Sequence, residues 1–319
     1  MRKFTFELNE KVTRTEIRFT NRFGIELAGD LYLPIDAGDK KLPALVISGP
    51  FGAVKEQASG RYANEMASYG FAALAFDGSY TGESGGTPRN VAAPDINTED
   101  FMAAVDGIGL QSDVDRERIG VVGICGWGSI ALNAVSMDKR VKAIATVSMV
   151  DVAAGFAGLS LEQRTQMLES LSQQRWADAE SGTFAPMADQ LPAELPENAD
   201  MDTKETVEFY RTPRGFHENS ILSNGRWNAT MPFSFMSTQL LNHIDEISPR
   251  PTLFIVGDQA FSKPLSEMAY AKAKEPKELI IVSDAWHSTL YDRMDKIPFD
   301  KLVEFFIENL GTIPPPITE

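Results

Sequence analysis

The sequence predicts an α/β fold: a mostly parallel, doubly wound sheet of about eight strands. Short apolar runs of strand length recur along the chain, and stretches with apolar residues at helical spacing separate them. This alternation is typical of a parallel sheet covered by helices on both faces. It stops after residue 150 and resumes at residue 250. We therefore expect one core domain formed by residues 1–150 and 250–319, with residues 151–249 inserted as a helical cap after the sixth strand.

The expected elements follow in chain order. Alternating polar and apolar residues at 14–20 and 25–33 predict two antiparallel strands. Apolar runs then predict strands at 43–49, 71–77, 118–123, 141–148, 251–257 and 278–283. Helical spacing predicts core helices at 57–69, 98–110, 127–137, 264–273 and 298–310, and cap helices at 161–176, 202–210 and 235–244.

Composition narrows the classes of function. The formal net charge of -15 and the pI of about 4.7 disfavour nucleic-acid and membrane partners, because phosphate backbones and anionic lipids repel an acidic protein. One cysteine allows no internal disulfide and fits a reducing compartment. The N-terminus has no apolar segment typical of a signal peptide, so we expect a cytoplasmic protein. The sequence leaves the oligomeric state open, with a homodimer as one expectation.

The sequence offers no sign of a cofactor or metal. The loop at 78–88 (GSYTGESGGTP) is rich in glycine but lacks the G-x-x-x-x-G-K-[ST] phosphate-binding pattern. We expect it to form a wall of the site at the edge of the sheet. His, Cys and Asp residues do not cluster at metal-ligand spacing, so we expect neither a cofactor nor a metal.

The stretch GICGWG, residues 123–128, carries the chemistry. It joins an apolar strand to a predicted helix, and glycines at 123, 126 and 128 surround Cys125. A sharp turn from strand to helix needs small residues, and the residue at its apex is exposed. This pattern matches the nucleophile elbow G-x-S-x-G with cysteine in place of serine. A helix N-terminus stabilises a thiolate, so we expect the pKa of Cys125 to lie below about 7.5.

His287 is the predicted base for this thiol. The chain has three histidines, and His217 and His243 fall in the insertion. His287 follows the strand at 278–283 after a short loop, which emerges at the carboxyl edge of the sheet together with Cys125. A cysteine nucleophile needs a base within hydrogen-bond reach, and His287 meets this requirement by its position.

The chain resembles an α/β-hydrolase over nearly its whole length, with the nucleophile first, a cap after the sixth strand and the histidine last. Cysteine in the elbow makes it similar to the dienelactone hydrolases, which use a Cys-His-Asp triad. Other segments resemble a bacterial branch related to fungal polyketide acyltransferases and thiohydrolases. These segments are GPFGAVKEQASG at 49–60, FDGSYTGESGG at 76–86, YRTPRG at 210–215 and WHSTLYD at 286–292.

The resemblance implies a triad acid and an oxyanion hole. The usual position of the acid, after the seventh strand, is Ala260 here, which leaves Asp258 in the same loop or Asp151 after the sixth strand. A Cys-His pair without an acid also remains open, because a thiol is far more acidic than a hydroxyl. The backbone N–H groups of Phe51 and Gly126 are the expected oxyanion donors.

Aromatic residues are the candidates for a substrate pocket. Most aromatic residues of the insertion should form its core, and Trp127 should pack beneath the elbow. The residues that we nevertheless consider for the pocket are Trp127, Tyr210, Trp227 and Phe235. Arg211 and Arg214 could meet a substrate carboxylate, although a solvated surface is the favoured interpretation of both.

These residues predict a cofactor-independent hydrolase of ester, thioester or lactone bonds, acting on a small acyl substrate through an acyl-enzyme on Cys125. Two alternatives remain: an acyltransferase that uses the same intermediate, and a non-catalytic protein of the same fold that binds a small molecule. The bulky Trp127 and the missing acid at Ala260 favour the last of these.

Overall fold

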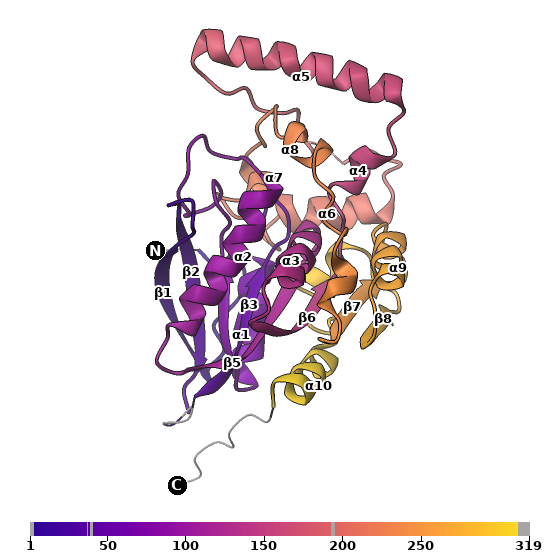
Figure 1. Cartoon of the computed structure of the whole chain (residues 1–319). Coiled ribbons are helices and arrows are strands. Elements are labelled where there is room, and N and C mark those ends of the chain that lie inside the picture. Colours follow the sequence, from indigo (N-terminus) through magenta and orange to yellow (C-terminus); the bar gives the residue numbers. More distant parts are fainter. Residues whose placement is uncertain (1–2, 37, 39–40, 193–194, 312–319) are drawn as a thin grey trace.

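The structure, a computed structural model that describes residues 3–36, 38, 41–192 and 195–311, is built on one eight-stranded sheet (Figure 1). The strand order is β1-β2-β4-β3-β5-β6-β7-β8. Pairing is antiparallel from β1 to β2 and from β2 to β4, and parallel across all later neighbours. The predicted fold class is therefore confirmed. The strands are β1 Val12–Thr20, β2 Glu26–Pro34, β3 Leu42–Ser48, β4 Ala72–Phe76, β5 Val114–Ile124, β6 Val141–Val147, β7 Thr252–Gly257 and β8 Lys277–Val282.

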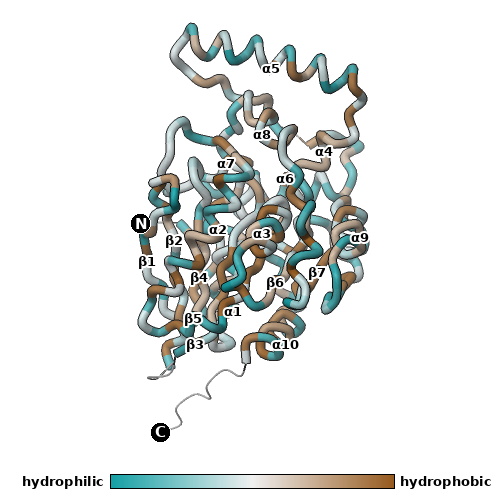
Figure 2. The backbone as a smooth tube through the Cα atoms, in the orientation of Figure 1, coloured by the Kyte–Doolittle hydropathy of each residue, from teal (hydrophilic) through white to brown (hydrophobic). Residues whose placement is uncertain are grey.

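Helices cover both faces of the sheet (Figure 1). In β3, Val46 faces one hydrophobic core, while its neighbours Leu45 and Ile47 face the other, because side chains alternate along a strand. Figure 2 shows that the most hydrophobic parts of the chain run through the strands and these helices. On the Val46 side lie α2 Pro94–Gly109, α3 Gly126–Met137 and α9 Lys263–Lys272, and on the other side α1 Ala58–Ser68 and α10 Phe299–Leu310.

Helix α2 begins four residues earlier than its expected start at Thr98. Pro94 occupies the first turn, where the lack of an N–H costs nothing. Asn97 lies inside the helix, and its Oδ1 accepts a hydrogen bond from the Ala93 N–H at 3.0 Å. The apolar spacing correctly indicated the helix but did not indicate where it begins.

The segment between β6 and β7 is helical and lies beyond one edge of the sheet (Figure 1). The expected helix at 235–244 was wrong: the chain has a short helix ending at Met236, followed by turns and a 3₁₀ turn beginning at Ile244. The long helix α5 stands away from the body, and only Leu171 and Asp178 of it are buried. The elements are α4 Ala154–Ala157, α5 Leu161–Ser181, α6 Met201–Arg211, α7 Ile221–Asn224, α8 Pro232–Met236 and η1 Ile244–Ile247.

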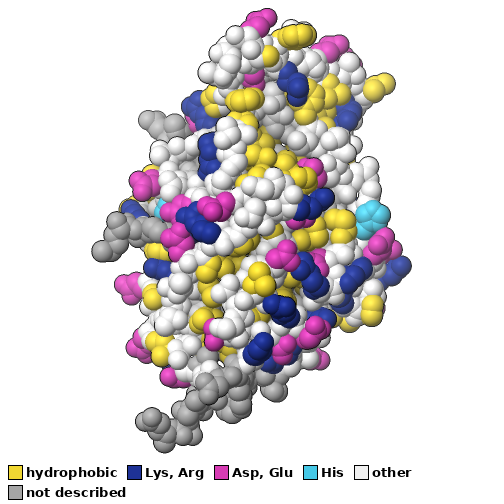
Figure 3. Space-filling model, turned by 60° about the vertical axis from the view of Figure 1, so that its left-hand side comes forward, with side chains coloured by type: hydrophobic (Ala, Val, Ile, Leu, Met, Phe, Trp, Pro, Cys, Tyr) yellow, Lys and Arg dark blue, Asp and Glu magenta, His cyan; other side chains and the backbone are white. Residues whose placement is uncertain are grey.

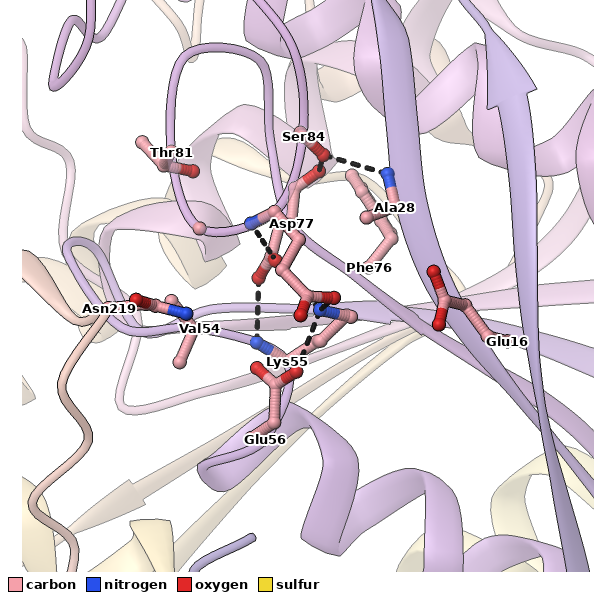
Figure 4. Close-up of polar contacts among 12 residues, drawn as sticks. Glu16, Ala28, Val54, Lys55, Glu56, Phe76, Asp77, Thr81, Ser84 and Asn219 are labelled. Carbon is pink, nitrogen blue, oxygen red and sulfur yellow. Dashed lines mark hydrogen bonds and ion pairs between the residues drawn. The ribbon is translucent and has the colours of Figure 1, made fainter. Parts of the chain in front are cut away.

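A fully buried lysine, Lys55, forms ion pairs that connect the loop after β3 to the loop after β4. Lys55 Nζ lies 2.7 Å from a carboxylate oxygen of Glu56, 3.0 Å from Asp77 and 2.7 Å from Glu83 (Figure 4). Asp77 also accepts hydrogen bonds from the N–H groups of Lys55 and Glu83. The surrounding carboxylates raise the pKa of Lys55 despite its burial. The glycine-rich loop at 78–88 contributes Glu83 to this cluster. The expectation that the loop forms a wall of the site was wrong, because other segments line the cavity described below.

The surface mixes charges. On the face shown in Figure 3, basic side chains lie beside acidic ones, and hydrophobic side chains gather in its upper half. In the described part of the chain, each helix is too short or too polar to cross a bilayer.

Replacing Lys55 with methionine should destabilise the fold by about 3–5 kcal/mol, because it leaves buried carboxylates without their cation. Urea unfolding monitored by circular dichroism would measure the loss. The matched control is Lys301→Met, which removes an exposed pair with Glu304 and should change the midpoint little. Equal effects of the two substitutions would contradict a supporting role for the cluster.

Candidate active site

Cys125 occupies the turn between β5 and α3 with a backbone conformation that is rare for a residue with a side chain, φ 58° and ψ -131°. The glycines around it make this turn possible. A Cβ on Gly123 would lie 2.7 Å from that of Ala131, and one on Gly126 would lie 2.7 Å from Val152. Side chains at these positions would push α3 and the segment after β6 away from the turn. The elbow predicted from GICGWG is therefore present in the structure.

His287 faces the thiol. Its Nε2 lies 3.3 Å from Cys125 Sγ, although the two residues are 162 positions apart. His217 is buried elsewhere, where its Nδ1 accepts the Asn219 N–H, and His243 pairs with Glu246 on the surface. Of the three histidines, the structure brings His287 to the cysteine, as the chain order predicts.

The partner of the imidazole on its other side is a serine. His287 Nδ1 lies 2.7 Å from Ser262 Oγ, and Ser262 is fully buried just before α9. For Nε2 to accept the thiol proton, Nδ1 must carry the hydrogen and donate it to this hydroxyl. Ser262 thus occupies the position that a carboxylate holds in a Ser-His-Asp triad.

Neither expected aspartate reaches His287. Asp151 folds back on its own turn, where its Oδ1 accepts the N–H groups of Ala153 at 3.1 Å and Ala154 at 3.3 Å. Asp258 Oδ1 accepts the N–H of Ala285 at 3.4 Å. Both expectations for the triad acid are corrected here, because each carboxylate binds the backbone of a loop while the path of the chain after β7 brings Ser262 to the imidazole.

Tyr291 is a contact of the pair that sequence reasoning missed. It is buried, and its hydroxyl lies 2.8 Å from His287 Nε2. The same hydroxyl hydrogen-bonds Cys125, which lowers the pKa of the thiol. His287 directly precedes the 3₁₀ turn η2, Ser288–Tyr291, and Tyr291 ends it, so their spacing of four could have drawn attention to the tyrosine.

Two backbone N–H groups point at the sulfur. Those of Phe51 and Gly126 both hydrogen-bond Cys125 and lower the pKa of its thiol. These are the same two donors that the sequence predicts for an oxyanion hole. Two N–H donors that converge beside one thiol are the kind of arrangement that an oxyanion hole requires.

The cysteine and histidine are neutral at rest. Burial raises the pKa of the Cys125 thiol, and the hydrogen bonds to it only partly offset this effect. Burial also lowers the pKa of His287 to about 3. The expectation of a thiol pKa below about 7.5 is corrected, because the nonpolar surroundings outweigh the helix N-terminus. A neutral thiol therefore lies beside a neutral imidazole, whose Nε2 can accept a proton.

A mostly apolar cavity of about 560 Å³ opens above the thiol. Of the four aromatic residues considered for a pocket, only Tyr210 lines it. Trp127 packs in the core against Phe76 and Phe101, as the favoured interpretation had it. Trp227 and Phe235 are buried behind Phe51, on which their rings pack. The lining residues include Phe51, Val150, Asp151, Val152, Phe156, Met187, Thr206, Tyr210, Leu222, Met231, Phe261, Leu265 and Tyr291.

Tyr210 has an unusual hydroxyl. The group is buried and has no hydrogen-bond partner in the described structure. Burial and the nearby Cys125 both raise its pKa, so it remains protonated. An unpaired buried donor costs roughly 1–3 kcal/mol, and this one belongs to a residue that lines the cavity.

Helix α6 of the insertion holds the histidine loop in place. Asp202 accepts the His287 N–H at 2.8 Å and the Phe261 N–H at 2.6 Å. Four residues further along, the Thr206 hydroxyl lies 2.8 Å from that of Ser288. The insertion therefore positions the imidazole as well as covering the cavity.

Arg214 and Arg211 both bind protein groups. Arg214 binds Asp292 through two of its nitrogens and also pairs with Glu205, so it docks the insertion to the core. Arg211 donates to the carbonyl oxygen of Ser223. In the described residues, no cluster of three or more His, Cys, Asp or Glu side chains is arranged to hold a metal ion.

Comparisons with known proteins agree with this fold. Two relatives span nearly the whole chain. An uncharacterised protein of Pseudomonas aeruginosa is 56% identical over 317 residues, covering 96% of this chain and 83% of the relative. Escherichia coli YcjY, also uncharacterised, is 33% identical over 316 residues, covering 95% of this chain and all of the relative. The crystal structure of the Pseudomonas protein superposes with a TM-score of 0.93, at 55% identity over 96% of both chains.

A more distant neighbour carries a named activity. The α/β-hydrolase GrgF of a Penicillium species, a polyketide transferase, superposes with a TM-score of 0.76 at 23% identity over 93% of this chain and 99% of its own. The model of the X-Pro dipeptidyl-peptidase (S15) family matches residues 24–282. The eight-stranded sheet, the elbow and this match agree: the chain belongs to the X-Pro dipeptidyl-peptidase (S15) family, of the α/β-hydrolase type.

Proposed function

We propose that the protein is a cofactor-independent hydrolase of acyl esters, thioesters or lactones that works through a covalent acyl-enzyme on Cys125. The observation that carries this proposal is the 3.3 Å contact between Cys125 Sγ and His287 Nε2 beside two converging N–H groups. A nucleophile, a base and oxyanion donors around one point are the components of acyl transfer. The cysteine nucleophile is the feature that the site would share with the dienelactone hydrolases.

The first half-reaction forms the acyl-enzyme. His287 Nε2 takes the thiol proton while Cys125 Sγ bonds to the carbonyl carbon of the substrate. The carbonyl oxygen becomes an oxyanion and accepts hydrogen bonds from the Phe51 and Gly126 N–H groups. As the intermediate collapses, the bond to the leaving alcohol or thiol breaks, and His287 returns its proton to that group.

The second half-reaction releases the acyl group. Water enters, gives a proton to His287 and attacks the thioester carbon, and the departing Cys125 sulfur recovers the proton. An alcohol or amine in place of water would make the same site an acyltransferase. The similarity to a polyketide transferase favours this second candidate function. A small acyl molecule is the proposed partner of the site in either case.

Cys125→Ala should abolish turnover of activated esters and thioesters, because it removes the thiol that forms the proposed acyl-enzyme. In intact-mass spectrometry the wild-type protein should gain the mass of one acyl group and Cys125→Ala should not, which assigns the group to the one cysteine of the chain. Products formed with and without added alcohols separate hydrolysis from transfer. Turnover that survives in Cys125→Ala would refute the nucleophile. If the wild-type protein neither turns over these substrates nor becomes acylated, the result would favour the alternative of a non-catalytic protein that binds a small molecule.

The pH dependence should reflect a neutral base. Burial lowers the pKa of His287 from 6.5 to about 3, so kcat/KM should show no inflection near pH 6.5 and fall only at far lower pH. In the unfolded chain His287 takes up a proton near pH 6.5, whereas in the folded protein it stays neutral down to about pH 3. The free energy of unfolding should therefore also decline as the pH falls below 6.5. Brief assays, followed by recovery at neutral pH, separate the two effects. An acid limb centred near pH 6.5 with the fold intact would contradict the prediction.

Ser262→Ala should lower kcat about tenfold with little change in KM, because it removes one hydrogen bond, worth about 1.4 kcal/mol, that orients the imidazole in the transition state. The matched control is Asp258→Asn, which alters a loop contact away from the imidazole and should leave kcat nearly unchanged. Steady-state kinetics on both variants, with their unfolding midpoints, test this assignment. A larger loss in Asp258→Asn would restore the aspartate as the partner of His287.

A further inference from the structure

Asp151 places a carboxylate in the wall of the apolar cavity. It is the only carboxylate among the described residues that line the cavity, and its side chain is largely buried. It lines the same cavity as the proposed nucleophile, Cys125. The N–H of the preceding residue, Val150, donates to the carbonyl oxygen of Cys125 at 3.1 Å, which fixes this segment against the elbow.

One oxygen of Asp151 is used by the protein and the other is not. Oδ1 accepts the N–H groups of Ala153 and Ala154, which holds the turn that leads into α4. Oδ2 has no hydrogen-bond partner among the described residues, and it is not sealed from solvent. The side chains of the neighbouring lining residues Val150 and Val152 are apolar and carry no hydrogen-bond donor.

A carboxylate oxygen without a partner in an apolar cavity favours ligands that carry a hydrogen-bond donor over plain hydrocarbon ligands. A plain hydrocarbon chain that fills the cavity would shield Oδ2 from solvent and leave the oxygen without a hydrogen bond. A chain with a hydroxyl or ammonium group at the right distance would donate a hydrogen bond to it. Sites that hydrogen-bond a substrate strongly reject analogues that lack the bonding group, because their own polar atoms are then left unpaired.

We propose that Asp151 Oδ2 binds a hydrogen-bond donor, a hydroxyl or an ammonium group, on the acyl chain of the substrate, so that the cavity selects functionalised acyl groups over plain hydrocarbon ones. This inference rests on the proposed function of the same cavity. It gives Asp151 a role in specificity, distinct from the triad position that Ser262 occupies.

The test compares N-acetylcysteamine thioesters of octanoate with those of hydroxyoctanoates, carrying the hydroxyl at successive positions, and of aminooctanoate. Wild-type kcat/KM should be about 10- to 100-fold higher for the best donor-bearing thioester than for octanoyl, the range expected for a hydrogen bond to a charged group. The position and kind of the preferred donor distinguish a hydroxyl ligand from an ammonium ligand. Equal rates for all the thioesters would overturn the proposal.

Asp151→Asn is the informative variant. Its side-chain oxygen can still accept the Ala153 and Ala154 N–H groups, so the turn is kept, while an amide NH₂ replaces the free acceptor. The preference for donor-bearing thioesters should fall at least tenfold. Asp258→Asn is the control that removes a carboxylate outside the cavity wall, and it should keep the wild-type preference. An unchanged preference in Asp151→Asn would overturn the proposal.

Two further measurements distinguish a failure of the Asp151 subsite from a failure of the proposed function. If Asp151→Asn fails to fold, calorimetry on the wild-type protein with hydroxyoctanoate and octanoate as free acids tests the subsite directly, and equal affinities would overturn it. Acylation of wild-type Cys125 by the octanoyl thioester tests the proposed function by itself. Acylation without donor preference would refute the subsite alone, whereas no acylation by any of the thioesters would refute the proposed function.

Discussion

The contact between Cys125 Sγ and His287 Nε2 is the interaction that the rest of the structure serves. The two residues follow β5 and β8, which β6 and β7 separate in the sheet. Parallel strands bring their carboxyl ends to one edge, so the sheet aligns the two loops before any side chain interacts. The glycines beside Cys125 let the elbow bend, and Asp202 fixes the backbone of His287. The core and the insertion therefore both help to position Cys125 and His287 relative to each other.

Residues whose roles follow from local sequence could be predicted. Glycine spacing identified the elbow, chain order identified His287, and the loop after β3 identified Phe51 as an N–H donor. The histidine partner could not be predicted in this way, because it depends on the path of a loop. Counting from β7 reaches Ala260, while the chain continues to Ser262 before its side chain meets the imidazole.

Burial explains the other differences between sequence and structure. A helix N-terminus favours a thiolate, but the sequence does not show how far Cys125 is removed from solvent, and this desolvation is the largest influence on the pKa of its thiol, which it raises. Trp127 likewise lies only two residues after Cys125, yet it packs in the core against Phe76 and Phe101. A sequence gives the order of side chains, whereas packing decides which of them face the cavity.

The absence of a carboxylate at His287 Nδ1 has a chemical consequence for the proposed reaction. A triad aspartate stabilises the imidazolium that forms when the nucleophile gives up its proton, and the neutral hydroxyl of Ser262 supplies much less of this stabilisation. The imidazolium of the proposed mechanism therefore has to be short-lived, and it loses its proton to the leaving group as the intermediate collapses. An imidazolium without a carboxylate partner is also the stronger acid, which assists the departure of an alcohol or a thiol in the proposed reaction.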